Sequence, residues 1–166
     1  MSLSRRCFSL GIVMKSLLLG CGFTPLLDKS QNGSNILNQG KFDFFPPSDE
    51  ISFKIKEELL KDLGFPKKPK HKISVNTNLT SIKGIITKEN DITRYNLILR
   101  TTLELISIKD NGKFYEKNFI SETAYSASKN VTGFATKMAE TSAKQRLAKD
   151  TANKIVIDLL MLGEEI

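Results

Sequence analysis

The feature that constrains the fold most is a stretch of alternating hydrophobic and polar residues, followed by a turn signal and a second extended stretch. Between residues 94 and 108, hydrophobic side chains share one face of an extended chain, and polar side chains fill most of the other. The hydrophobic set is Tyr95, Leu97, Leu99, Leu103 and Leu105. Asp110-Asn111-Gly112 then favours a tight hairpin turn, and residues 113–125 form the returning strand. This pattern predicts a long antiparallel hairpin with one buried face.

Two further strands are predicted upstream of this hairpin. In residues 72–86, Ile73, Val75 and Leu79 sit at odd positions between polar residues, which is typical of a half-buried strand. Residues 36–45 hold a short strand that Pro46-Pro47 closes. Glu89-Asn90-Asp91 supplies the turn that leads into the hairpin.

Two helices are predicted from spacings of three and four residues. In the first, Ser48 is the expected N-cap, Gly64 the stop, and the buried face consists of Ile51, Ile55, Leu59 and Leu63. The second runs from about Thr132 to Leu162. Its predicted apolar stripe is Phe134, Met138, Ala148, Ala152, Ile155, Val156 and Leu159, with Lys137, Lys144, Lys154 and Asp158 away from it. We expect this stripe to lie in the core and not on a membrane.

The predicted element order is β-α-β-β-β-α. Two helices most simply cover one face of a four-stranded, mainly antiparallel sheet, so we predict an α+β two-layer sandwich. The chain has 166 residues, which suits one domain, predicted over residues 37–166.

Residues 1–20 have the organisation of a secretory signal, with Arg5 and Arg6 first, then an apolar stretch. Leu18-Leu19-Gly20-Cys21 matches the lipobox of bacterial lipoprotein signals, so we expect cleavage before Cys21 and lipidation of its thiol, with residues 21–36 as lipidated N-terminus and tether. The alternative is an uncleaved hydrophobic N-terminus with an incidental cysteine. Ser4-Arg5-Arg6-Cys7-Phe8 resembles a twin-arginine motif, and general secretion remains the alternative export route.

Composition restricts the chemistry of the predicted mature chain. Cys21 is its single cysteine and His71 its single histidine, which excludes a disulfide within it and predicts neither a metal site nor a cofactor. His71 is predicted to be a surface residue. The sequence has no nucleophile elbow, P-loop, HExxH motif or Asp-rich metal loop, so we expect no catalytic residues and no enzyme activity.

The net charge points to an anionic partner. It is +7 for the whole chain, and the loss of Arg5, Arg6 and Lys15 with the leader leaves +4. A nucleic acid would suit this charge, but an exported lipoprotein is in the wrong compartment to bind one. The basic cluster Lys67, Lys68, Lys70 and Lys72, beside Lys83, is the expected place for phosphate groups to bind; the alternative is ordinary solvated lysines.

The sequence from Cys21 to Leu26, CGFTPL, resembles the start of the mature lipopolysaccharide-assembly lipoproteins, the LptE family, in their alphaproteobacterial form. The resemblance continues through Leu59-Leu60, the strand YNLIL from Tyr95 to Leu99, and the C-terminal helix rich in Ala, Lys and Gln. It implies a lipoprotein anchored to the periplasmic side of the outer membrane, a destination that Gly22 also favours. It further implies a protein that plugs the LptD β-barrel, assists its assembly and binds lipopolysaccharide.

Alignment on the Tyr95 strand and the final helix implies glycolipid contacts at Lys72 and Lys137, near a strand start and a helix start. The rival function is that of a structural lipoprotein that scaffolds an envelope complex without binding lipopolysaccharide. It would keep the anchor and the fold, and its lysines would serve solubility alone.

Overall fold

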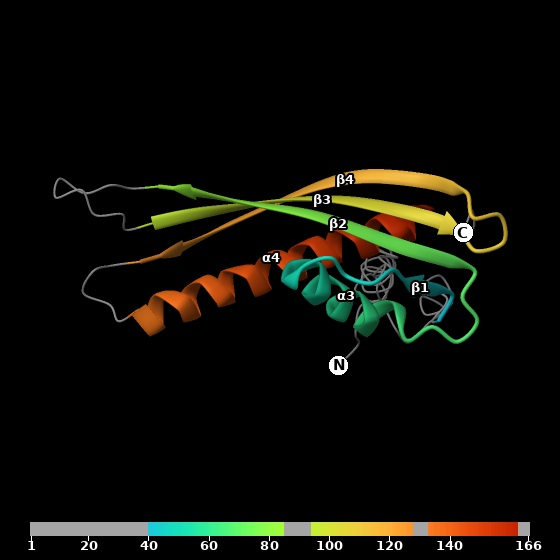
Figure 1. Ribbon diagram of the computed structural model, residues 1–166, viewed down its shortest axis with the longest axis horizontal. Coiled ribbons are helices and arrows are strands. Elements are labelled where there is room, and N and C mark those ends of the chain that lie inside the picture. Colours follow the sequence, from blue (N-terminus) through green and yellow to red (C-terminus); the bar gives the residue numbers. More distant parts are fainter. Residues whose placement is uncertain (1–39, 85–93, 128–132, 163–166) are drawn as a thin grey trace, which may run out of the picture. The chain divides into compact units, whose positions relative to one another are not determined.

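The computed structural model describes residues 40–84, 94–127 and 133–162 of the chain. Its elements follow in the order β1 (Phe42–Phe44), α3 (Glu50–Leu63), β2 (His71–Lys83), β3 (Arg94–Ser107), β4 (Lys113–Ser126) and α4 (Gly133–Leu162) (Figure 1). This order and the α+β class confirm the prediction. The expected turn at residues 89–91 and the start of the first expected strand, residues 36–39, lie outside the described residues.

The four strands form one sheet in the order β1-β2-β3-β4. β1 runs parallel to β2, with Phe42 opposite His71. β2 and β3 are antiparallel, as are β3 and β4, over almost their whole lengths. The β3–β4 turn contains Asn111 at a φ of 50°, a left-handed conformation that asparagine tolerates well. The predicted hairpin turn is therefore confirmed.

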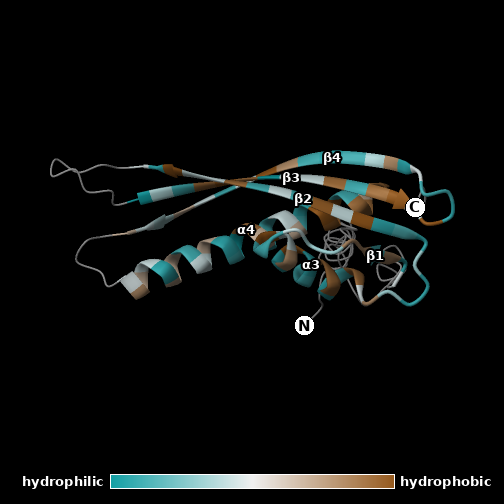
Figure 2. Ribbon diagram, in the orientation of Figure 1, coloured by the Kyte–Doolittle hydropathy of each residue, from teal (hydrophilic) through white to brown (hydrophobic). Residues whose placement is uncertain are grey.

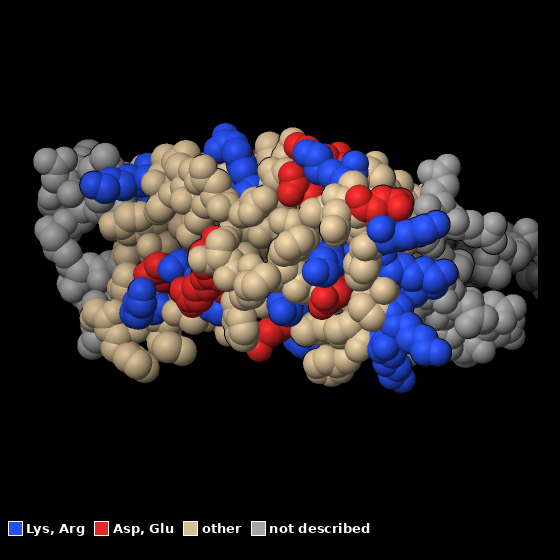
Figure 3. Space-filling view, turned by 45° about the vertical axis from the view of Figure 1, so that its right-hand side comes forward, with Lys and Arg blue, Asp and Glu red and all other residues tan. Residues whose placement is uncertain are grey.

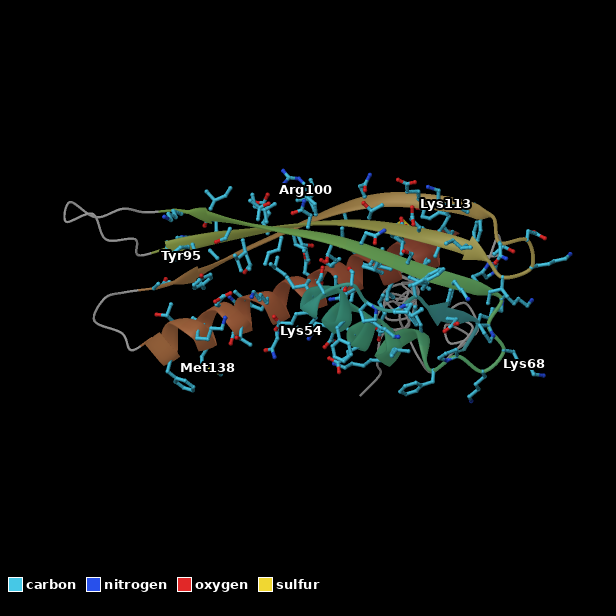
Figure 4. The ribbon with its side chains drawn as sticks, in the orientation of Figure 1. Lys54, Lys68, Tyr95, Arg100, Lys113 and Met138 are labelled. Carbon is cyan, nitrogen blue, oxygen red and sulfur yellow. The ribbon has the colours of Figure 1, made fainter. Side chains whose placement is uncertain are left out.

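Alternation along β3 separates a buried face of the sheet from an open face. The odd-numbered positions of β3 face the helices, and every one from 97 to 105 is buried: Leu97, Leu99, Thr101, Leu103 and Leu105. Arg100 points away from the helices, on the open face (Figure 4). The strands carry the corresponding bands of hydrophobic and hydrophilic residues (Figure 2). Both helices pack on the buried face, as predicted for a two-layer sandwich.

The first helix, α3, begins one residue later than the sequence suggested. Its N-cap is Asp49 and not Ser48. The Asp49 carboxylate accepts a hydrogen bond from the Ser52 amide at 2.7 Å, and the Ser52 hydroxyl accepts one from the Asp49 amide at 3.0 Å. This reciprocal pair satisfies two amides at the helix start. Gly64 ends the helix with a φ of 74°, and the predicted face of Ile51, Ile55, Leu59 and Leu63 is buried.

The predicted stripe of α4 is only partly correct. Its buried residues begin at Ala143, whereas Phe134 is 75% exposed and Met138 is 49% exposed. The reason is length: α4 has 30 residues and α3 only 14, or about 45 Å against about 21 Å. The 4.0 Å approach of Lys144 to Glu50, the first residue of α3, marks where the two helices begin to lie together. Within residues 40–84, 94–127 and 133–162, no other helix lies beside the turns of α4 before that point.

The buried hydrophobic residues of the described ranges, from Phe42 to Leu160, form one cluster. The core draws on the sheet and on both helices. A single contiguous core of this kind is what an independently folding domain requires.

Candidate functional site: a lysine-rich end of the sheet

Six lysines gather where β2 begins and the β3–β4 turn lies. We call this group the basic end; its members are Lys41, Lys67, Lys68, Lys70, Lys72 and Lys109. They come from the start of β1, the loop between α3 and β2, the start of β2 and the β3–β4 turn. Cationic side chains crowd one side of the surface seen in Figure 3. Figure 4 places Lys68 at this end, pointing outward.

Backbone hydrogen bonds hold these segments together. The Lys70 amide donates to the Lys41 carbonyl at 2.7 Å, and the Ile108 amide donates to the Lys70 carbonyl at 3.0 Å. The Lys67 amide donates to the Gly40 carbonyl at 3.0 Å. Residues 65–70 between α3 and β2, which we call the basic loop, are therefore fixed to β1 on one side and to the β3–β4 turn on the other.

Gly40 makes this arrangement possible. Its φ is 91°, a conformation that side chains other than glycine rarely adopt. A Cβ atom at this position would lie 2.9 Å from the Phe65 carbonyl oxygen and 3.0 Å from the Lys67 amide nitrogen. A glycine therefore lets the start of the described chain pass directly beneath the basic loop.

The lysines of the basic end have no carboxylate partner among the residues described. Lys72 instead places its ammonium 5.4 Å from the centre of the Phe45 ring, a cation–π contact. Asp110 follows Lys109 in the chain, and Asp43 lies opposite Lys72 in register, so two aspartates adjoin six lysines. The positive charge of this end is consequently not neutralised locally.

The pKa of His71 is affected by the positive potential of the basic end. Burial lowers the pKa of its imidazole, and the ammonium groups of Lys41 and Lys70 lower that pKa further. The ring packs at 5.2 Å from Phe114 and 6.1 Å from Phe42, with its Nδ1 atom buried and without a hydrogen-bond partner among the residues described. His71 is therefore half-buried and not a simple surface histidine, because the rings of Phe42 and Phe114 pack against it.

Apolar side chains are exposed among these lysines. Phe65, in the basic loop, is 74% exposed, and Ile108 and Phe114 are exposed beside the β3–β4 turn. The Phe114 ring contacts His71 at its edge, as described above. The basic end thus combines a fixed backbone, unpaired ammonium groups and three exposed apolar side chains.

Lys137 lies elsewhere. It is the fifth residue of α4 and pairs with Glu140 at 3.3 Å. Glu140 is close enough to Tyr125 to raise the pKa of that phenol, which burial raises more strongly. Tyr125 lies opposite Tyr95 in register and stacks on it with the ring centres 5.2 Å apart, and Tyr95 lies opposite Lys83. Lys137 therefore belongs to the end of the sheet where β2 finishes.

The two lysines implied by the resemblance do not form one patch. Lys72 and Lys83 are separated by eleven residues of one strand, or about 36 Å. Lys72 is at the basic end, whereas Lys83 and Lys137 are near the opposite end, where Figure 4 shows Met138. The expected clustering of Lys83 with Lys67, Lys68, Lys70 and Lys72 was wrong for the same reason: an extended strand carries its ends far apart.

The sequence prediction missed two members of the basic end. Lys41 and Lys109 are remote from the basic loop in the chain and join it only through the pairing of β1 with β2 and the bond from Ile108 to Lys70. Their positions beside predicted strand ends were the available signal. Cys21, the predicted lipidation site, lies outside the described residues.

Other hollows of the described surface have mixed polar and apolar linings. The hollow between α3 and α4 has a volume of about 500 Å³ and is lined by Lys54, Glu57, Glu58, Ser142, Gln145, Arg146, Ala148 and Lys149. Within residues 40–84, 94–127 and 133–162, no three His, Cys, Asp or Glu side chains are grouped closely enough to hold a metal ion. No helix in those ranges has the length and apolar character needed to cross a membrane.

No protein-family model matches the sequence, and no curated protein is similar to it in sequence. Solved structures share its fold. A protein assigned as a lipoprotein from Caulobacter crescentus CB15 superposes with a TM-score of 0.62 at 15% identity, over 77% of this chain and 95% of that one.

Two further similar structures are the rare lipoprotein B from Shewanella oneidensis and a minor lipoprotein from Acinetobacter baumannii. The first has a TM-score of 0.53 at 10% identity and covers 72% of this chain and 91% of its own. The second has a TM-score of 0.51 at 12% identity and covers 72% of this chain and 88% of its own. The described domain therefore has a fold that occurs in bacterial lipoproteins.

Proposed function

We propose that this chain is an outer-membrane lipoprotein of the lipopolysaccharide transport and assembly machinery. The observation that carries the proposal is the combination of the lipobox ending at Cys21 with a domain whose fold occurs in bacterial lipoproteins. The CGFTPL start, which resembles the LptE family, narrows the proposal to that machinery. In this proposal the protein is anchored on the periplasmic side, has no enzyme activity, needs no cofactor and binds no nucleic acid.

The proposed ligand is lipopolysaccharide, whose lipid A carries phosphate groups that lysine ammonium groups bind as point charges. Lys137 is 68% exposed and lies between two exposed apolar residues, Phe134 and Met138, so it offers a cation beside an apolar surface. Lys72 offers a cation within the basic end. Since the two lie at opposite ends of the sheet, each is proposed as a separate contact.

The proposed protein partner is an LptD-like β-barrel, which the domain would plug and help to assemble. The open face of the sheet supports this proposal because it carries the polar side chains Asn76, Thr102 and Asn118, which line a hollow together with the exposed Ile120. The lumens of large outer-membrane barrels are polar and accept surfaces of this kind.

The anchor is tested by metabolic labelling with palmitate. We expect label in the wild-type chain and none in Cys21→Ser, because the thioether requires the thiol. A matched control is Cys7→Ser, which removes the other cysteine of the chain and should keep the label. Equal labelling of wild type and Cys21→Ser would refute the anchor.

The partner is tested by purification from outer membranes in detergent. We expect co-purification of a large barrel protein that survives moderate salt, because an obligate interface buries more than about 2,000 Å². Depletion of this chain should also lower the amount of assembled barrel. Absence of a co-purified barrel, together with unchanged barrel levels, would leave the scaffold function instead.

Lipopolysaccharide binding is tested by reversing one charge at a time. We expect Lys137→Glu and Lys72→Glu to weaken binding more than Lys149→Glu, a matched control on the same helix as Lys137. Lys149 is exposed and has no ion-pair partner in the described ranges. Lys154 is unsuitable as a control because its ammonium donates to the Ile120 carbonyl at 2.8 Å. Equal losses in all three variants would show that binding follows bulk charge.

A further inference from the structure

We propose that the basic end rests on the surface of an anionic phospholipid bilayer, so that the domain stands on the membrane in one orientation. The inference depends on the proposed lipid anchor only for its biological setting. The contact itself is a property of the folded domain. The proposed partner is the phospholipid headgroup surface of a bilayer. Of the two lipopolysaccharide contacts proposed above, Lys137 lies outside the basic end, whereas Lys72 belongs to it.

The attachment point of the domain supports this orientation. The described chain begins at Gly40, whose amide donates to the Leu63 carbonyl at 3.1 Å and whose carbonyl accepts from the Lys67 amide. Everything N-terminal to Gly40, including Cys21, is joined to the domain at this position. A lipid on Cys21 is therefore joined to the described domain through residues 22–39, which enter it at the basic end.

The charge distribution supports it independently. Many lysines elsewhere in the described structure form ion pairs, as in Lys54–Glu50, Lys61–Glu58, Lys113–Glu116, Lys144–Glu140 and Lys154–Asp150. The six lysines of the basic end form none with the residues described, and they project from one end of the sheet. An unpaired cluster of this kind complements a negatively charged surface, where each nearby lysine strengthens binding about fivefold.

The exposed apolar side chains of the basic end also fit a bilayer surface. Phe65, Ile108 and Phe114 lie among the lysines, and all three are exposed. At a bilayer surface, aromatic and aliphatic side chains enter the boundary between headgroups and acyl chains while lysines contact the headgroups. Pro66 and Pro69 and the backbone bonds to Gly40 and Lys41 restrict the basic loop, so little ordering is needed for contact.

The test is sedimentation with vesicles, using residues 21–166 with Cys21→Ser so that no lipid contributes. This chain contains the whole described core cluster, from Phe42 to Leu160, and circular dichroism checks that it is folded. Vesicles contain phosphatidylcholine alone or phosphatidylcholine with one quarter phosphatidylglycerol. The double variant Lys67→Glu with Lys68→Glu is compared with Lys83→Glu with Lys149→Glu, which changes the net charge equally but far from the basic end. Phe65→Ser tests the apolar contribution.

We expect binding to the anionic vesicles and much weaker binding to phosphatidylcholine alone. The Lys67 and Lys68 variant should lose about 25-fold or more in vesicle affinity, since each lost lysine removes about fivefold. The control double variant should lose far less affinity for the vesicles. Phe65→Ser should lose several-fold in affinity at every salt concentration. Raising salt from 0.15 M to 1 M shortens the Debye length from about 8 Å to about 3 Å, and it should abolish the difference between the two double variants.

Two results would overturn the inference: no binding of the wild-type domain to anionic vesicles, or equal losses in the two double variants. Circular dichroism of each variant excludes unfolding as the cause of a loss. The proposed function is tested separately by palmitate labelling and lipopolysaccharide binding. A domain that binds lipopolysaccharide but not the vesicles would retain the proposed function and refute this contact.

Discussion

The Asp158 carboxylate of α4 accepts a 2.8 Å hydrogen bond from the Tyr115 hydroxyl of β4, although Asp158 is only 5% exposed. The Lys117 ammonium donates to the other carboxylate oxygen of Asp158. Tyr115 and Lys117 occupy odd positions of β4 and so face the helices. This group ties the last turns of α4 to the edge strand of the sheet, and it corrects the sequence prediction that Asp158 lies on the solvated side of its helix.

We predict that Asp158→Ala destabilises the domain by about 1–3 kcal/mol, because it leaves the Tyr115 hydroxyl without its acceptor and opens a small cavity. Urea unfolding followed by circular dichroism measures the loss. Glu58→Ala is a control that removes a carboxylate from a surface pair with Lys61, and it should change stability by no more than about 0.5 kcal/mol. Equal effects of the two substitutions would contradict a structural role for Asp158.

We predict that the domain loses stability at alkaline pH through this same group. The hydrogen bond to Asp158 raises the pKa of Lys117 above 10.5, and burial followed by the bond to Asp158 raises the pKa of Tyr115 above 10.0. Both groups hold their protons more tightly in the folded state than in the unfolded state. Their contribution to stability is therefore complete below about pH 10, and it disappears as the pH rises through their pKa values in the folded state. Urea midpoints between pH 8 and 11 should fall less steeply in Asp158→Ala. Parallel declines in the variant and the wild type would rule this out.

We predict that Leu99→Asp unfolds the domain and that Asn96→Asp does not. Leu99 is completely buried on the helix face of β3, and an unpaired buried carboxylate costs several kcal/mol, comparable to the stability of a small domain. Asn96 is half-buried on the opposite face of the same strand. Thermal melts compare the two variants. Similar melting temperatures would mean that the two faces of the sheet are equally buried.

We predict that Asp49→Ala costs about 1 kcal/mol of stability, because it removes the N-cap of α3 and a hydrogen bond from the Thr77 hydroxyl. Ser48→Ala, the cap that the sequence suggested, should be nearly neutral. Burial raises the pKa of Asp49, but hydrogen bonds from the Ser52 amide and the Thr77 hydroxyl lower it more strongly. The pKa of Asp49 therefore lies below 3.8. The difference between the two variants, measured by urea unfolding, should therefore shrink as the pH falls below 3.8. A larger loss of stability in Ser48→Ala than in Asp49→Ala would show that Ser48 is the N-cap.

We predict that Gly40→Ala destabilises the domain by about 1–2 kcal/mol, since alanine at a φ of 91° is strained and its Cβ would press on the Phe65 carbonyl. Gly112→Ala is the matched control. A Cβ there meets no atom within 4 Å, so its effect should stay within about 0.5 kcal/mol. Differential scanning calorimetry compares the two. A neutral Gly40→Ala would show that the start of the described chain can move away from the basic loop.

The sequence by itself determined the strands, the hairpin turn and the buried face of α3. Leu97, Leu99, Leu103 and Leu105 alternate with polar residues, and only one extended arrangement buries all four. The α3 residues spaced four apart likewise leave one helical face to bury. These patterns are local, since a residue's neighbours along the chain fix the direction of its side chain.

The tertiary structure alone decided how far each pattern reaches and which charges meet. Phe134 and Met138 continue the α4 stripe, but α3 is too short to cover them. Asp158 is polar by type, yet Tyr115 and Lys117 of a distant strand provide partners that make its burial possible. In the same way the basic end assembles from Lys41, Lys67–Lys72 and Lys109, while Lys83 is carried about 36 Å away along β2. Contacts between residues far apart in the chain depend on strand register and helix length, which no local pattern encodes.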